Sequence, residues 1–181
     1  MKFVIGIGNP GKSYDKTRHN VGFAVLDRLK DSGIKKTEAM FVKPETFVNR
    51  TGEAVAALLK KYPKATAQDF LIVCDDVNLL FGKMRLRGSG SAGGHHGLES
   101  VIEALGGNGF SRLRIGVGQE AMPKDLTGFV LEKFSKSEQK ALDEILERAV
   151  LVCESWVNEG LEASMNVLSR LQSVKSRESV E

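Results

Sequence analysis

Residues 3–11, Phe-Val-Ile-Gly-Ile-Gly-Asn-Pro-Gly, decide the class of fold. The stretch from Phe3 to Ile7 is apolar and stops at Asn9-Pro10-Gly11, which is the pattern of a buried strand bounded by turn residues. Phe70–Cys74 is another apolar run of this form, and Leu113–Val117, closed by Gly118, is also typical of a strand. The sequence therefore predicts at least three buried strands, spread along the chain.

Between these runs, apolar residues recur at helical spacing. After Thr51, for example, Val55, Leu58, Leu59 and Tyr62 stand at i, i+3, i+4 and i+7. The sequence predicts helices at residues 20–30, from residue 51, and at 98–105, 135–156 and 161–171, with further strands at 40–42 and 83–87. Strands that alternate with helices predict a single α/β domain, in which helices cover both faces of a largely parallel, twisted mixed sheet in three layers.

Polar residues mark several of the expected boundaries. Asn20 stands where it can cap the first helix, and Ser135 with Glu138 forms a capping box before the longest one. The second apolar run stops at Asp75-Asp76, so we expect that strand to end there. Ligand sites in such sheets lie beyond the carboxyl ends of the strands, which predicts that Asn9 and Asp75 meet at one edge.

The whole chain has the composition of an ordinary globular protein. Its 181 residues suit one domain, which we place at residues 1–172, followed by a short polar tail at 173–181. The start lacks the apolar stretch of a signal peptide and no stretch is long enough for a membrane helix, so we expect a soluble, cytoplasmic protein without membrane contact. A monomer is the default expectation. Two widely spaced cysteines indicate buried thiols in a reducing compartment.

The net charge of +3 says little about partners, but the basic residues cluster. Each cluster adjoins a glycine-rich turn: Lys12, Lys16 and Arg18; Lys83, Arg85 and Arg87; Arg112 and Arg114. Such clusters fit either a solvated face or contacts to nucleic acid.

A dinucleotide-binding motif is present in form only. Gly6-Ile-Gly-Asn-Pro-Gly11 matches G-x-G-x-x-G after a strand, but that motif must open directly into a helix. Here a polar, aperiodic segment follows, and no helix can easily begin before Asn20. A nucleotide-dependent oxidoreductase is therefore a weak alternative, and we expect no organic cofactor.

His19 is the candidate general base. It lies in a polar loop before a helix, and Asp75 at the predicted strand end can accept a hydrogen bond from one ring nitrogen and leave the other free. Asp75 could instead cap a helix or a turn, and its neighbour Asp76 could serve as the partner of His19. No serine or cysteine lies in a nucleophile motif, so the nucleophile is expected to be water. These residues alone predict no more than a hydrolase.

Other polar residues have more than one interpretation. Asn9 and Asn49 suit a carbonyl or a developing oxyanion, although asparagine also favours turns. Gly93-Gly-His-His96 enters a helix, which fits either an anion site or a helix cap. The adjacent histidines lack further ligands at suitable spacing, so we expect no metal.

Taken together, the motifs resemble the bacterial peptidyl-tRNA hydrolase family. The resemblance runs in order through nearly the whole chain, to about residue 171. It is carried by Gly6-Ile-Gly-Asn-Pro-Gly-Lys-Ser-Tyr, Thr17-Arg-His-Asn-Val-Gly, Lys43-Pro-Glu-Thr-Phe-Val-Asn, Gly52-Glu-Ala-Val, Asp75-Asp-Val-Asn-Leu, Gly82-Lys-Met-Arg-Leu-Arg, Gly93-Gly-His-His-Gly-Leu, Arg112-Leu-Arg-Ile-Gly and Gly128-Phe-Val-Leu.

The resemblance implies roles for individual residues. His19 matches the catalytic base, Asp75 its supporting acid, and Asn9 the residue that distinguishes N-blocked aminoacyl-tRNA. The resemblance further implies that the protein hydrolyses the ester bond between the peptide and tRNA without a cofactor, and that it binds peptidyl-tRNA at the acceptor stem and CCA end. Residues matching positions for the tRNA 3′ end and peptide are Tyr14, Phe47, Asn49 and His96, and those matching a 5′-phosphate clamp are Arg87 and Arg114.

The chain departs from the family pattern in two places. His96 stands where the family usually has asparagine, and a histidine can become charged near neutral pH. The stretch between His19 and Asn49 is short, so one strand of an edge hairpin before Met40 is expected to be missing. These departures leave open a relative that binds RNA without hydrolysis.

Overall fold

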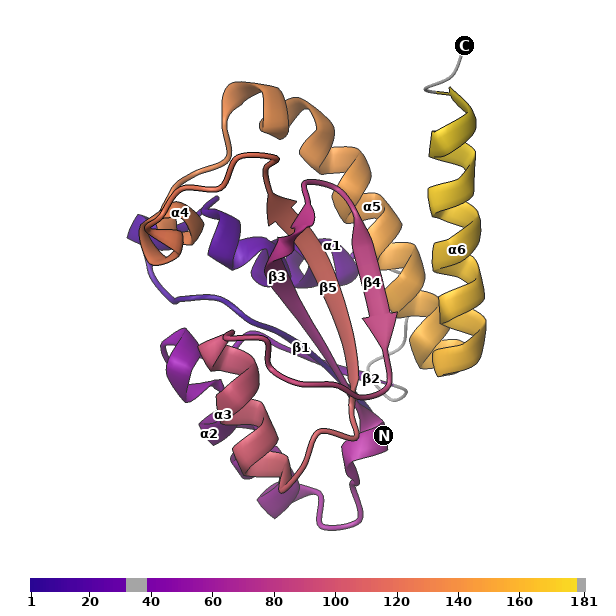
Figure 1. Ribbon diagram of the computed structural model, residues 1–181. Coiled ribbons are helices and arrows are strands. Elements are labelled where there is room, and N and C mark those ends of the chain that lie inside the picture. Colours follow the sequence, from indigo (N-terminus) through magenta and orange to yellow (C-terminus); the bar gives the residue numbers. More distant parts are fainter. Residues whose placement is uncertain (32–38, 179–181) are drawn as a thin grey trace.

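The apolar run that opens the chain forms β1 (Lys2–Gly6), a strand inside a five-stranded sheet (Figure 1). The computed structural model describes residues 1–31 and 39–178, and its strand order is β2-β1-β3-β5-β4. β1 pairs in parallel with β2 (Ala39–Val42) and β3 (Phe70–Leu80), and β3 does so with β5 (Ser111–Gly118). Among the described strands, only β4 (Met84–Arg87) pairs antiparallel, with β5. The predicted mixed, largely parallel sheet is confirmed.

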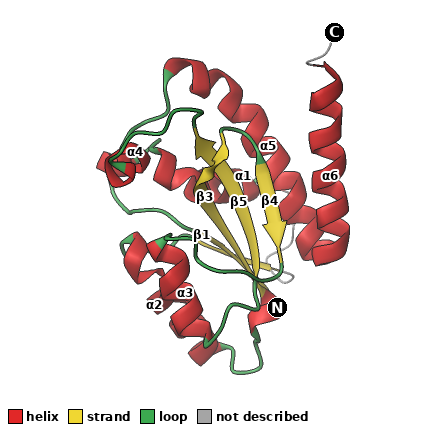
Figure 2. Ribbon diagram, viewed as in Figure 1, coloured by secondary structure: helices red, strands yellow, loops and turns green. Residues whose placement is uncertain are grey.

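Alternating side chains divide the core into two layers. Along β3, the side chains of Phe70 and Ile72 pack on the face covered by α2 (Thr51–Lys61) and α3 (His96–Leu105). Those of Leu71 and Val73 pack on the opposite face. Helices α1 (Val21–Leu29) and α5 (Lys136–Asn158) cover that second face, and α6 (Leu161–Glu178) packs against α5 and β4. Figure 2 shows the sheet between these two groups of helices, so the three-layer prediction is confirmed.

Several element boundaries differ from the prediction. β3 does not end before Asp75 but continues to Leu80, because Asp75 and Asp76 pair with β5 inside the sheet. The final helix does not stop near residue 171 but continues to Glu178, so the polar tail predicted from Ser173 begins within a helix. The hairpin strand expected to be missing before Met40 concerns residues 32–38, which lie outside the described residues.

Short 3-10 turns connect the larger elements. The segment after β1 holds η1 (Lys12–Tyr14) and η2 (Arg18–Asn20), and α1 begins at Val21. As predicted, the glycine motif does not open directly into an α-helix: the 3-10 turn η1 follows it, and the first α-helix begins at Val21. The remaining short elements are η3 (Val48–Arg50), η4 (Ala67–Asp69) and a helix that we did not predict, α4 (Leu126–Leu131). None of the described helices combines the length and the apolar character needed to cross a membrane.

The two predicted caps behave differently. The capping box of Ser135 and Glu138 is present at the start of α5. Asn20 occupies the N-cap position of α1, but its side chain does not cap the helix. Instead, Asn20 accepts a hydrogen bond from the Asn9 amide and donates one to the Asn9 carbonyl, at 2.8 and 2.9 Å. The loop after β1 is thereby tied to the turn that carries His19.

Gly22 allows α1 to lie close to the sheet. A Cβ at this position would stand 2.4 Å from the carbonyl oxygen of Val73 and 2.6 Å from that of Ile7. Both are backbone atoms of the sheet region and cannot rotate away. Because Gly22 follows η2 by two residues, this close approach also sets the distance between η2 and β3.

Candidate active site

A cavity of about 560 Å³ opens where the carboxyl ends of the parallel strands meet. Segments far apart in the sequence line it, as expected for such a sheet. Among the lining residues are Asn9, His19, Phe47, Asn49, Asp75, Asp76, Asn78, His95, His96, Arg114, Leu126, Thr127, Val130 and Leu131. The structure thus brings most of the predicted site residues together.

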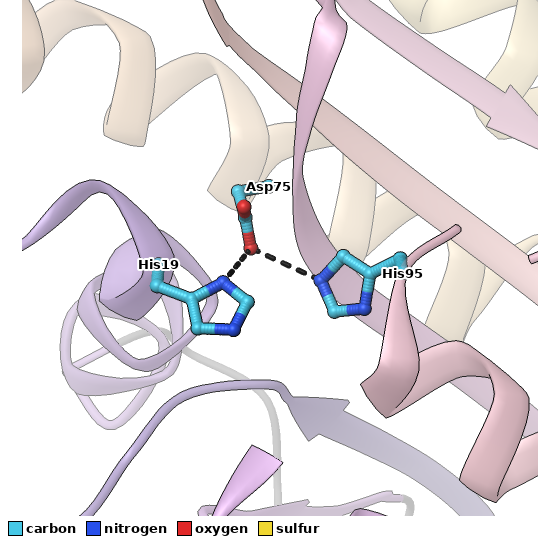
Figure 3. Close-up of side chains that lie close together, drawn as sticks. All are labelled: His19, Asp75 and His95. Carbon is cyan, nitrogen blue, oxygen red and sulfur yellow. Dashed lines mark hydrogen bonds and ion pairs between the residues drawn. The ribbon is translucent and has the colours of Figure 1, made fainter. Parts of the chain in front are cut away.

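Three of the side chains that line this cavity, His19, Asp75 and His95, lie close together (Figure 3). One oxygen of Asp75, Oδ1, lies 2.8 Å from Nδ1 of His19 and 3.1 Å from Nε2 of His95. The Asp75 side chain is only 3% exposed, whereas the two rings border the cavity. Asp75 is therefore the partner of His19, and the alternative partner, Asp76, is not.

The hydrogen bonds define which ring nitrogen carries a proton. The Leu98 amide donates to Nδ1 of His95 at 3.3 Å, so His95 caps α3 and its Nε2 carries the hydrogen that Asp75 accepts. His19 donates to Asp75 through Nδ1. Its Nε2 then holds a free lone pair, which is the state that a general base requires.

Burial and charge act on this group in opposite directions. Burial raises the pKa of Asp75, but the two histidines outweigh it and hold that pKa well below its usual range. For His19, burial lowers the pKa, but the charge of Asp75 and their hydrogen bond outweigh it, so the pKa of His19 is raised above 6.5. Asp75 thus stays ionised and stabilises an imidazolium at His19.

The same three residues are the group in the described part of the chain whose geometry could hold a metal ion. The structure therefore corrects the expectation that no further ligand accompanies the histidines. A metal would need the lone pair of His95 Nε2, which would move the proton to Nδ1, opposite the Leu98 amide hydrogen. Two donors would then face each other, so the residues fit a hydrogen-bonded triad better than a metal site.

Asn9 presents a hydrogen-bond donor to the cavity. Its Oδ1 accepts from the backbone amide of Val48 at 3.0 Å, which leaves Nδ2 for a ligand. Val48 begins η3, the turn that also carries Asn49 to the cavity. Phe47 is 52% exposed at the rim, and the ring of Tyr14 meets it edge-on at 6.1 Å. Tyr14 itself is not among the lining residues.

The predicted arginines differ in their surroundings. Arg114 lines the cavity, pairs with Asp76 at 3.3 Å and donates to the Ser91 and Ala92 carbonyls of the glycine-rich loop. Arg87 is exposed on β4 and does not line the cavity. His96 does line it, with its ring Nδ1 2.9 Å from Glu99 on the exposed first turn of α3.

The basic clusters are not uniformly solvated, contrary to one of the two interpretations. Arg112 is 1% exposed, lies over the ring of Phe110 and donates to the carbonyls of Gly90, Ser91 and Asn108. Arg18 is 4% exposed and also points into the protein. Both side chains organise loops beside the cavity and offer no free charge to solvent.

Comparison with known proteins identifies the family. The family model described as peptidyl-tRNA hydrolase matches residues 3–177. The chain belongs to the peptidyl-tRNA hydrolase family. A peptidyl-tRNA hydrolase from Synechococcus sp. (strain JA-3-3Ab) is 44% identical, over 92% of this chain and 81% of that protein. One from Exiguobacterium sibiricum is 42% identical, over 92% and 98%. The crystal structure of peptidyl-tRNA hydrolase from Acinetobacter baumannii superposes with a TM-score of 0.81 at 28% identity, over 93% and 94% of the two chains.

Two parts of this candidate site escaped the sequence prediction. His95 appeared only as a possible anion or capping residue, because its contact with Asp75 is tertiary. The wall formed by α4 was also missed, although Asp125 caps the helix and Leu126 and Val130 stand one turn apart. Six residues are too few for a clear periodic signal.

Proposed function

We propose that this chain hydrolyses the ester bond between a peptide, or an N-blocked aminoacyl group, and tRNA, with His19 as the general base. The observation that carries the proposal is the free Nε2 of His19, held toward the cavity by the buried, ionised Asp75. Membership of the peptidyl-tRNA hydrolase family supports the substrate, since the relatives bear that name.

The reaction follows from this geometry in two steps. His19 Nε2 takes a proton from a water molecule, whose oxygen forms a bond to the ester carbonyl carbon. The carbonyl oxygen becomes an oxyanion, to which Asn9 Nδ2 can donate. The carbon–oxygen bond to the ribose then breaks, and the imidazolium of His19 returns its proton to the ribose oxygen. The products are the free peptide acid and free tRNA, and Asp75 remains ionised throughout.

We further propose how the substrate binds. The tRNA 3′ end and the peptide lie along the cavity and its rim, near Tyr14, Phe47, Asn49 and His96. Arg87 and Arg114 contact the phosphate of the tRNA 5′ end, because a guanidinium can hold a phosphate with two hydrogen bonds. The exposed Arg87 is free to do so, whereas Arg114 would share its charge with Asp76. The monomeric state and the cytoplasmic location stay predictions.

The deciding experiment is release of free tRNA from N-acetyl-aminoacyl-tRNA by the wild type and by His19→Ala. We expect turnover in the wild type, no turnover in the variant, and nearly equal tRNA binding by both. Turnover by His19→Ala would remove His19 as the base. Tight tRNA binding by a wild type without turnover would instead indicate the non-catalytic RNA-binding relative that His96 leaves open.

A further inference from the structure

Arg18 directly precedes the proposed base but turns its side chain away from the cavity. It is 4% exposed, and its backbone amide donates to the Glu132 carbonyl at 3.0 Å. Its neighbour Thr17 forms a β-bridge with Lys133. The turn that carries His19 is therefore joined through its backbone to the segment between α4 and α5.

The guanidinium of Arg18 reinforces this join on the side of α4. Its Nη1 donates to the Phe129 carbonyl at 3.2 Å, and its Cζ lies 4.2 Å from the centre of the Phe129 ring. Hydrogen bonding at the edge of the guanidinium and stacking on its face fix both position and orientation, which a point charge would not do.

The other side of the guanidinium is anchored to α5. Nη2 of Arg18 donates to Oε2 of Glu138 at 2.9 Å, and the same oxygen accepts from the Ser135 amide at 2.6 Å. Glu138 is 9% exposed and closes the capping box of α5, a 23-residue helix in the core. One buried side chain thus connects the His19 turn, α4 and the start of a rigid helix.

The six-residue helix α4 lies between this connection and the cavity. Among the named elements of the described chain, α4 packs mainly against η2, which carries Arg18 and His19. Its other side lines the cavity with Leu126, Val130 and Leu131. Phe129 of α4 belongs to the buried core cluster, and Arg18 is the side chain that both donates to its carbonyl and stacks on its ring.

We propose that Arg18 is a positioning residue that holds the apolar α4 wall at a fixed distance from His19, so that the wall contacts the acyl group of the substrate. This inference rests on the proposed function for its effect on turnover. Its structural part, the dependence of α4 on Arg18, can be measured without any turnover.

The test compares Arg18→Met with Arg148→Met. Arg148 is a matched control, because it is also buried, donates to a carbonyl and pairs with a glutamate of α5, but lies outside the cavity. We expect faster hydrogen exchange at the amides of residues 126–131 in Arg18→Met and not in Arg148→Met. Unchanged exchange in α4, or equal acceleration in both variants, would overturn the inference.

The functional arm uses two substrates, N-acetyl-leucyl-tRNA and N-acetylglycyl-tRNA. In Arg18→Met we expect KM for the leucyl substrate to rise about tenfold, with a smaller rise for the glycyl substrate and an unchanged pH midpoint of kcat. An equal rise for both substrates would contradict a role of the wall. Loss of the proposed function would appear differently, as absence of turnover in the wild type.

If Arg18→Met does not fold, Arg18→Lys replaces it in both arms. Lysine keeps a charge for Glu138 but loses the planar stack and the bond to the Phe129 carbonyl. We expect the same selective changes in weaker form. A folded Arg18→Lys with wild-type exchange and wild-type KM for both substrates would refute the proposal.

Discussion

His19 and Asp75 are 56 positions apart in the chain, yet Nδ1 of His19 lies 2.8 Å from Oδ1 of Asp75. One residue belongs to a 3-10 turn above the sheet and the other to a strand within it. The contact depends on how closely α1 approaches the sheet and on how the two residues share charge. Each of these dependences can be tested by a single substitution.

Asp75→Asn is expected to slow turnover by about 10²–10⁴-fold, because the imidazolium that forms at His19 loses its counter-charge. His19 works only when neutral, and its pKa is raised above 6.5 by Asp75. Activity in the wild type should therefore fall as the pH drops through a midpoint above 6.5. Without the carboxylate, burial dominates and the midpoint should move to lower pH. The measurement is kcat/KM against pH.

Asp76→Asn is the matched control for this prediction. It makes the same change one residue along, at a carboxylate that pairs with Arg114 and not with His19. Its pH midpoint should equal that of the wild type. A midpoint that stays in place in Asp75→Asn would argue against the His19–Asp75 pair as the origin of the pH dependence.

His95 combines two roles that substitution can separate. In His95→Asn, the new side chain can still cap α3, since asparagine is a favoured N-cap residue, but it is too short to keep the ring contact with Asp75. In His95→Ala both roles are lost. We expect similar losses of activity in the two variants and an additional loss of about 1 kcal/mol of unfolding free energy in His95→Ala. Urea unfolding and turnover, measured side by side, check this; near-wild-type activity in His95→Asn would mean that His95 is only a cap.

Gly22→Ala is expected to reduce stability and activity together. The added Cβ would meet the Val73 and Ile7 carbonyls, so α1 must move away from the sheet. Such overpacking costs about 1–3 kcal/mol of unfolding free energy, and the shift carries η2 away from β3. Gly107→Ala is the control, because nothing lies within 4 Å of its Cβ. Wild-type turnover in Gly22→Ala would show that the approach of α1 does not set the position of His19.

Arg87→Ala and Arg114→Ala are each expected to weaken tRNA binding. Each should also reduce the slope of log affinity against log salt by about one unit. Arg114→Ala should lose more affinity at every salt concentration, because it also releases Asp76 and the carbonyls of the glycine-rich loop. Arg170→Ala, an exposed arginine of α6, serves as the control. Slopes that match the wild type in all three variants would assign Arg87 and Arg114 to the solvated surface.

The sequence was sufficient to predict the sheet and the helices that cover it, because the hydrophobic patterns of these elements are local. The run at Phe3–Ile7 and the spacing of Val55, Leu58 and Leu59 each reflect the face that a residue buries. The predicted strand end was wrong where charged residues interrupt the hydrophobic pattern of β3. Asp75 and Asp76 suggested a strand end, but they are buried in β3, where partners distant in sequence compensate their charge.

The site was predictable only in part, for the same reason. His19 lies shortly before α1, Asn9 shortly after β1 and Asp75 directly after the apolar run Phe70–Cys74, so all three could be proposed from position and residue type. The contact of His95 with Asp75, and the burial of Arg18 against Phe129, arise from packing between elements and leave no local pattern. The end of α6 was misplaced because residues 172–178 are mostly polar, which is typical of a tail, although Val174 continues the i+3 spacing and several of the polar residues favour a helix.

The interaction between His19 and Asp75 also affects the stability of the folded state. Because the pKa of His19 is raised on folding, the folded chain holds this proton more tightly than the unfolded chain does. The resulting stabilisation is complete below about pH 6.5 and is lost as the pH rises through the folded pKa. Catalysis requires the opposite protonation state. The protein therefore works in the pH range where protonation of His19 has stopped contributing to its stability, and the hydrogen bond to Asp75 and the contacts of the surrounding core must hold the site together.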